Sequence, residues 1–190
     1  GMTYFAQMNR EQNAIALMTL GNLPGIGPQT IKKILDQEGG VDEVFKQSWK
    51  RLMHEYGLTK AQAKTIAEAK ENDHARSVLR DLEMAGISVT AYNDEDYPKR
   101  LLRCNDAPVL LFGKGHRVWN AKKTVAVVGM RQASDYGKRM CEKLVQELMP
   151  YNPLIISGLA FGIDIVAHRT ALKNGLKTMA CLAHGLDIVY

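Results

Sequence analysis

Two turns of this chain hold residue types that bind phosphate groups. Val125–Arg131 and Ile155–Asp164 each begin as an apolar, β-branched run, break at a glycine and enter a helical pattern. The start of a helix offers backbone N–H donors, and Arg131 adds a guanidinium. Ser134 and Ser157 add hydroxyl groups. We therefore predict an anion site where the two turns lie side by side, at the carboxyl ends of parallel strands.

The same turns lack the signatures of other nucleotide-binding loops. A dinucleotide site needs Gly-x-Gly-x-x-Gly and an acidic residue after the second strand, but the first turn has only Gly129 and the second strand ends at Ser157. The phosphate loop of ATPases is absent as well. We therefore expect no cofactor, no metal and no catalytic residues. Asp164 and His168, four residues apart, are expected to form a structural ion pair.

Two further side chains lie in the loops after the strands. Phe161 either packs against the neighbouring helix or stacks on a base, a contact worth about 1–3 kcal/mol. His184, beside Gly185, follows the third strand and is placed to reach the same ligand. A single histidine is weak evidence, so this contact rests on position alone.

Positive charge is concentrated in one part of the chain. The formal net charge is +5, and residues 99–143 hold 11 Lys/Arg against 3 Asp/Glu. Residues 1–72 hold 9 Lys/Arg against 8 Asp/Glu. A basic block beside a glycine-turn site indicates a polyanionic partner, and the alternative is an ordinary solvated surface.

Residues 1–72 are predicted to form a small all-α domain. Helical patterns are expected at residues 9–20, 41–49 and 59–70. Leu23–Leu35 has the sequence of a helix-hairpin-helix turn, in which glycines let the backbone approach a phosphate. Possible secondary phosphate contacts there are Gly25, Gly27 and Lys32. The alternative is that this turn only packs helices together.

Residues 73–190 are predicted to form an α/β, Rossmann-like domain. Strands are expected at residues 87–91, 109–113, 124–129, 154–157 and 177–182, and helices at 72–85, 134–149 and 162–174. The last three strands should be parallel with right-handed crossovers, and the first two should extend their sheet. The helix at 134–149 is expected to turn Met140, Leu144, Val145 and Leu148 inward.

The pattern stops where a third helix should follow. A parallel sheet normally continues until its faces and edges are covered. We therefore expect the chain to be a fragment of a longer protein, with a Rossmann-like domain that is incomplete at its C-terminal end.

Composition limits the class of protein. The chain is 46% apolar and 24% charged, which is ordinary for a globular protein. No apolar run reaches the roughly 18 residues that span a membrane, and no secretory signal opens the chain. Cys104, Cys141 and Cys181 have neither metal nor redox spacing, so buried, reduced thiols and a cytoplasmic location are expected.

Several motifs together resemble the DNA-processing protein A family, also called Smf, of bacterial natural transformation. They are Val125–Arg131, Ser157–Asp164 with Ala167 and His168, Gly185–Tyr190, Asp96–Pro98 with Leu101 and Leu102, and Asp106–Pro108 with Leu110–Gly115. The helical module around Leu23–Gly27 fits the front domain of that family. The resemblance covers essentially the whole chain.

The resemblance implies a fold, a function and a set of contacts. The fold is a Rossmann-like domain behind a helix-hairpin-helix or sterile-alpha-motif-like domain. The function is not enzymatic: the protein would bind single-stranded DNA without sequence choice, protect incoming DNA, form a homodimer and help to load the RecA recombinase. Together, the residues and the resemblance predict DNA contacts at Gly129, Met130, Arg131, Ser134, Ser157, Gly158, Phe161, His184 and Gly185. Met130 stands where the family usually has serine, and Phe161 where arginine is common.

Two other functions stay open. The first is a nucleotide-binding enzyme of the related phosphoribohydrolase-like Rossmann group, although the Pro-Gly-Gly-x-Gly-Thr-x-x-Glu run that carries its catalytic glutamate is absent from these 190 residues. The second is an assembly module in which residues 1–72 dock other proteins.

Overall fold

The computed structural model describes residues 4–36, 41–69 and 73–186. The chain divides into two compact units between Arg117 and Val118. This division falls later than the domain boundary expected after residue 72, because a β-hairpin packs with the helices that precede it. The boundary between evolutionary domains stays a prediction.

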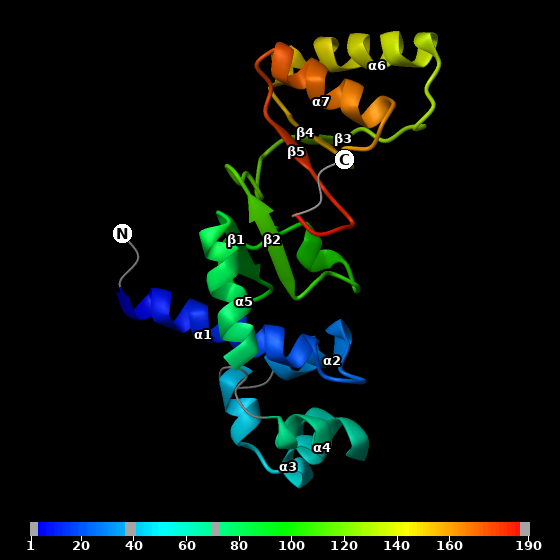
Figure 1. Cartoon of the computed structure of the whole chain (residues 1–190). Coiled ribbons are helices and arrows are strands. Elements are labelled where there is room, and N and C mark those ends of the chain that lie inside the picture. The colour runs from blue at the N-terminus through cyan, green and yellow to red at the C-terminus, as the bar shows by residue number, and fades with distance from the viewer. Residues whose placement is uncertain (1–3, 37–40, 70–72, 187–190) are drawn as a thin grey trace. The chain divides into compact units, whose positions relative to one another are not determined.

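The first unit begins with helices (Figure 1). They are α1 (Tyr4–Gly21), α2 (Pro28–Leu35), the 3-10 helix η1 (Val41–Lys46), α3 (Trp49–Tyr56), α4 (Lys60–Glu68) and α5 (Asp73–Met84). The single helix predicted over residues 41–49 is wrong. The Ser48 hydroxyl accepts a hydrogen bond from the Arg51 N–H at 3.4 Å, which caps a new helix at Trp49.

The core of this unit is made by apolar side chains from α1 to α4. The fully buried members are Leu17, Leu20, Ile31, Val44, Leu52 and Ile66. Helix α4 is held at its start by a capping box, in which Thr59 and Gln62 each bond the backbone N–H of the other. The helical character predicted for this part of the chain is confirmed.

Two strands complete the first unit. β1 (Ile87–Ala91) and β2 (Leu110–Lys114) pair antiparallel, and the short 3-10 helix η2 (Leu101–Arg103) lies between them in the chain. The prediction that these strands extend the later sheet is wrong, because they form a separate two-stranded sheet. Val89 and Leu110 pack with α1 and α5, so the hairpin buries its apolar face on helices.

The second unit is a parallel three-stranded sheet with two helices. Its elements are β3 (Thr124–Ala126), α6 (Asp135–Glu147), the 3-10 helix η3 (Met149–Tyr151), β4 (Leu154–Ser157), α7 (Ile163–Lys173) and β5 (Thr178–Ala180). The strand order is β3-β4-β5. Both helices lie on one side of this sheet (Figure 1). The predicted α/β class with a parallel sheet is confirmed.

The inner face of α6 differs from the prediction. Cys141 and Val145 are buried against α7 and β4, whereas Met140 is 45% exposed and Leu144 is 49% exposed. The inner row of α6 is narrow because it packs on the small side chains of α7. Burial of all three thiols is also wrong, since only Cys141 is buried and Cys104 and Cys181 are exposed. None of the described helices is both long and apolar enough to cross a membrane.

A buried tyrosine offers a test of the first unit. Tyr97 is 1% exposed and donates a hydrogen bond to the Pro108 carbonyl at 2.6 Å. Tyr97→Phe leaves that carbonyl without this donor and should lower the free energy of unfolding by about 1–3 kcal/mol in urea titrations. Burial also raises the pKa of Tyr97 to about 12. The wild type should therefore lose stability as the pH rises above 10, and Tyr97→Phe should lose less.

Tyr136→Phe is the control for this experiment, because Tyr136 is 66% exposed. Its unfolding free energy should stay within about 0.5 kcal/mol of the wild type. Equal stability of the two variants would contradict the structural role of the Tyr97 hydroxyl.

Candidate nucleic-acid interface

The two turns at the carboxyl ends of β3 and β4 lie side by side, as expected. The Val127 N–H donates to the Ile156 carbonyl at 2.9 Å, which continues the pairing past the end of β3. The Ile163 N–H, at the start of α7, donates to the Met130 carbonyl at 3.2 Å. The second bond joins the backbone of one turn to that of the other.

Two glycines make this approach possible. A Cβ atom on Gly129 would lie 2.6 Å from the Cβ of Ile163, and one on Gly162 would collide with the carbonyl groups of Met130 and Arg131. Gly162 also has a φ of +84°, which side chains other than glycine rarely adopt. These glycines therefore bring two segments of backbone together, a role distinct from making space for a ligand.

The backbone donors predicted for phosphate binding at the second turn are already occupied. Asp164 is 6% exposed, and its Oδ2 accepts hydrogen bonds from the N–H groups of Gly158 at 3.2 Å and Ala160 at 3.4 Å. A buried carboxylate thus takes the position that an anionic ligand would take at the start of α7. The Gly158 N–H therefore already has a partner, and the DNA contact expected at Gly158 stays a prediction.

Both predicted serine hydroxyls form hydrogen bonds within the fold as well. Ser157 is 4% exposed and donates to the Val127 carbonyl at 2.7 Å. Ser134 accepts from the Gly137 N–H at 3.2 Å and so caps α6. His184 has its Nδ1 2.9 Å from the Gly185 carbonyl oxygen. Each of these groups has a structural partner.

Arg131 and a group of apolar side chains are the exposed parts of the turns. Met130 is 73% exposed and Phe161 is 72% exposed, so burial of Phe161, one of its two predicted roles, is wrong. Val128 at 83% and Leu159 at 44% belong to the same two turns, and the sequence analysis did not identify them. The apolar run continues beyond Ala126, where β3 ends, and this continuation could have identified Val128 as part of the turn. The Arg131 guanidinium is exposed and forms no ion pair with any residue in the described ranges.

Asp164 and His168 do not form the predicted ion pair. Thr178 Oγ1 donates to the Ile155 carbonyl at 3.0 Å, so it accepts at 2.6 Å from Nδ1 of His168. Burial lowers the pKa of His168, and the charge of Asp164 opposes that shift only in part. Among the described residues, neither Nε2 of His168 nor Oδ1 of Asp164 has a hydrogen-bond partner, although both atoms are buried.

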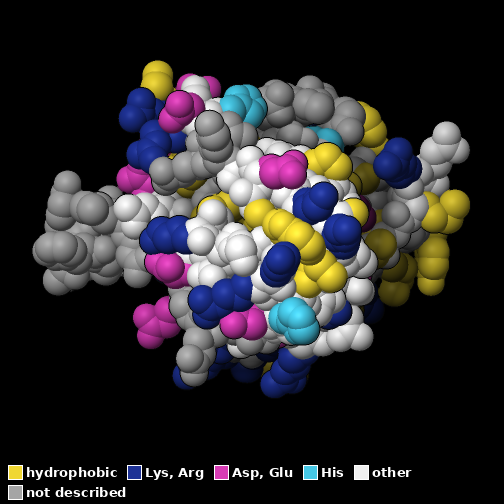
Figure 2. All heavy atoms as spheres, turned by 90° about the horizontal axis from the view of Figure 1, so that it is seen from below, with side chains coloured by type: hydrophobic (Ala, Val, Ile, Leu, Met, Phe, Trp, Pro, Cys, Tyr) yellow, Lys and Arg dark blue, Asp and Glu magenta, His cyan; other side chains and the backbone are white. Residues whose placement is uncertain are grey.

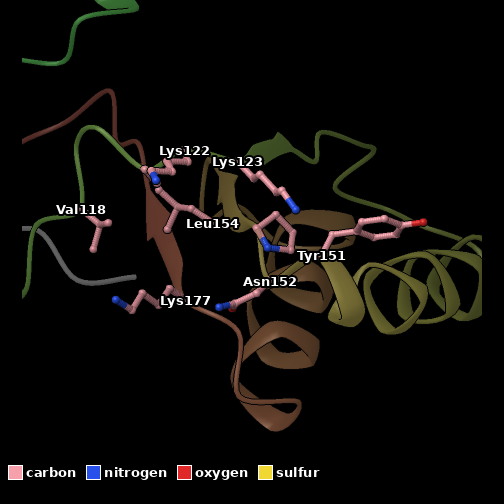
Figure 3. A pocket seen from close by; sticks show the side chains of 9 residues that line it. Val118, Lys122, Lys123, Tyr151, Asn152, Leu154 and Lys177 are labelled. Atoms are coloured by element: carbon pink, nitrogen blue, oxygen red, sulfur yellow. The ribbon is translucent and has the colours of Figure 1, made fainter.

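Part of the basic block lies away from these turns. A cavity of about 290 Å³ at the amino ends of the strands is lined by Lys122, Lys123 and Lys177, together with Tyr151 and Asn152 (Figure 3). Lys123 lies 5.7 Å from the centre of the Tyr151 ring. These lysines are at the opposite end of the sheet from Arg131, because parallel strands place all their amino ends together.

Other cations of the block lie on α6 and in the first unit. On α6, Lys138 pairs with Asp135 at 3.6 Å and Lys143 with Glu147 at 3.8 Å. Five more belong to the first unit: Lys99, Arg100, Arg103, Lys114 and Arg117. A basic surface around the strand-end turns therefore stays a prediction.

The helix-hairpin-helix turn is tied into the first unit. The Gly25 carbonyl accepts from Nε2 of Gln62 at 3.0 Å, and the Gly27 carbonyl accepts from the Ile31 N–H at 3.1 Å. Lys32 donates from Nζ to the Asn105 carbonyl at 2.9 Å and lies 5.1 Å from the Tyr92 ring. These contacts match a packing role, and a phosphate contact here stays a prediction.

Comparison with known proteins identifies the family of this chain. Residues 88–190 match the family described as DNA recombination-mediator protein A. The chain belongs to that family. DNA processing protein DprA of Streptococcus pneumoniae is 47% identical over 97 residues, which cover 51% of this chain and 34% of that protein. Protein Smf of Escherichia coli is 31% identical over 176 residues, which cover 93% of this chain and 45% of that protein.

A solved structure of the same family shares the fold. The X-ray structure of DNA processing protein A from Streptococcus pneumoniae superposes with a TM-score of 0.64 at 28% identity, and the match covers 99% of this chain and 60% of that one. The chain thus spans less than half the length of the two curated relatives above. The resemblance on which the sequence analysis relied is confirmed, and the contact residues remain predictions.

The junction between the turns can be tested with an alanine at Gly162. Gly162→Ala combines an unfavourable positive φ with a collision against the Met130 and Arg131 carbonyls, so it should destabilise the protein by about 2–4 kcal/mol. Gly175→Ala is the matched control, because Gly175 has a φ of +72° and open space around its Cβ position. It should cost about 1 kcal/mol. Equal losses in thermal or urea unfolding would show that the close approach is relaxed easily.

The buried histidine predicts a pH dependence of stability. Burial lowers the pKa of His168 from the ordinary histidine value of 6.5. As the pH falls below 6.5, His168 therefore binds a proton in the unfolded chain and stays neutral in the folded chain. The free energy of unfolding should therefore fall between about pH 7 and pH 5. His168→Asn keeps a donor toward Thr178 and should flatten that slope. Replacement of the exposed His54 by Asn should leave it unchanged, and an equal slope in all three proteins would refute the assignment.

Proposed function

We propose that the chain binds single-stranded DNA at the turns that follow β3 and β4. The family membership supports a DNA-processing role in recombination. The observation that carries the proposal is the exposed Arg131 guanidinium, which forms no ion pair with a described residue and belongs to the same turns as Met130 and Phe161. A cation beside exposed apolar side chains suits a ligand that has both phosphates and unpaired bases.

The exposed ring favours a single strand over a duplex. The bases of a duplex are stacked on one another, so their faces are closed to a protein side chain, whereas an unpaired base can stack on Phe161. Every base has such a face, and a guanidinium binds any phosphate. Binding should therefore depend strongly on salt and little on base sequence.

The wider function follows the relatives named DNA processing proteins. We propose that the whole protein acts without enzymatic activity, protects incoming DNA during natural transformation in the cytoplasm, and helps to load the RecA recombinase as a homodimer. The resemblance to this family supports these roles. The chain spans only 34–45% of the length of these relatives, so the roles are proposed for the whole protein.

Arg131→Ala is the direct test of the proposed site. Loss of one charge-assisted phosphate contact should weaken binding to fluorescein-labelled oligo-dT about tenfold at low salt. It should also reduce the slope of log K against log salt by about 0.7. Fluorescence anisotropy over a salt series measures both quantities.

Lys123→Ala is the control, because Lys123 lies at the amino ends of the strands. It should bind like the wild type. If Arg131→Ala binds as tightly as wild type while Lys123→Ala is weakened, the DNA site belongs at the opposite end of the sheet and our assignment is rejected.

A further inference from the structure

A second aromatic and cationic site lies on α3 and α4 of the first unit. The ammonium groups of Lys50, Lys60 and Lys64 lie 5.8, 5.6 and 5.8 Å from the centre of the Trp49 indole ring. Each distance is within the range of a cation–π contact, and indole is the strongest aromatic partner for such contacts. A cation–π contact requires one cation, so this ring has more cations around it than such a contact requires.

These lysines form no ion pair with any residue that the structure describes. Two acidic side chains near them in the sequence are paired elsewhere: Glu43 with Lys46 at 2.6 Å, and Glu55 with Arg51 at 2.8 Å. The three lysine side chains are exposed. Their mutual repulsion is therefore balanced by solvent and by the indole, and an anion placed among them would relieve it.

The ring itself is held by the fold. Trp49 is half-buried and packs against the same apolar core as Leu52 and Ile66. It is the first residue of α3, directly after the Ser48 cap, and Lys60 is the first residue of α4. The partially positive ends of two helices therefore add to the charge of the ammonium groups. An aromatic ring that the fold holds in place, surrounded by lysine side chains, resembles the platforms on which proteins stack the bases of a single strand.

The space-filling view shows this face of the molecule. Figure 2 looks from the side of α3 and α4 in Figure 1, and dark blue Lys and Arg side chains stand close around exposed hydrophobic atoms there.

We propose that Trp49 and the surrounding Lys50, Lys60 and Lys64 form a second binding surface for single-stranded DNA. The ammonium groups move from the ring to the phosphates when a strand binds, and the freed face of the indole stacks on a base. The chemical identity of this ligand rests on the proposed function, whereas the surface itself is defined by its own side chains.

A single strand fits this surface better than an acidic protein segment does. Lysines alone would accept carboxylates equally well, but an aromatic platform among them matches a ligand in which flat rings and anionic groups alternate. A duplex supplies the phosphates without open base faces. The indole ring therefore favours single-stranded DNA over an acidic protein segment and over a duplex. Its fluorescence reports directly whether a base stacks on it.

The reporter is the full chain with Trp119→Phe, which leaves Trp49 as the only tryptophan because the sequence has two. Titration with oligo-dT should quench its fluorescence to saturation. A strand of the same length with abasic sites should bind more weakly and quench much less. Duplex DNA of that length should not quench it. Absence of quenching at saturating oligo-dT, or equal quenching by all three ligands, overturns the proposal.

Charge removal provides the second measurement. Lys60→Gln combined with Lys64→Gln should lower the salt slope for oligo-dT by about 1.4, since two phosphate contacts are lost. Lys46→Gln is the matched control, because Lys46 is paired with Glu43. Trp49→Leu should weaken binding about fivefold or more. Circular dichroism and thermal unfolding confirm that each variant is folded, and wild-type binding by the double lysine variant overturns the proposal.

Arg131→Ala, assayed beside these variants, separates the two sites. If Arg131→Ala binds like the wild type and the lysine variant is weakened, the strand-end site fails and the platform stands. If the lysine variant binds like the wild type and Arg131→Ala is weakened, the platform fails and the strand-end site stands. Absence of any oligo-dT binding by the wild type at low salt rejects both.

Discussion

The close approach of two backbone turns is the constraint on which the second unit depends. Gly129 and Gly162 have no room for a side chain, and the bond from the Ile163 N–H to the Met130 carbonyl ties the turns together. This contact fixes where α7 begins relative to the end of β3. It therefore also fixes the direction of the exposed side chains that lie between them.

The polar groups of the turns satisfy one another as a consequence. In the loop before α7, the N–H groups of Gly158 and Ala160 donate to the carboxylate of Asp164. The Ser134 hydroxyl accepts from the Gly137 N–H, and the Ser157 hydroxyl donates to the Val127 carbonyl. The exposed side chains of the two turns are Arg131 and the apolar residues around it.

A polymer ligand suits a protein that offers several such small sites. Each contact contributes modest affinity, and contacts on one chain reinforce each other because binding at one raises the effective concentration of the strand at the next. The Trp49 surface and the Arg131 turn both combine cations with an aromatic ring, which is half-buried for Trp49 and exposed for Phe161.

The sequence by itself determined the fold class, the helices and the parallel sheet. Alternating and helical spacing of apolar residues depends on local geometry, and the glycine-containing turns marked the ends of β3 and β4. Only the tertiary structure decided which polar groups are free. Asp164 and Ser157 meet partners that are brought close by folding, the pairing of β1 with β2 separates them from the later sheet, and the lysines around Trp49 come from two helices. Contacts between distant residues depend on packing, which the spacing of residue types along a chain does not encode.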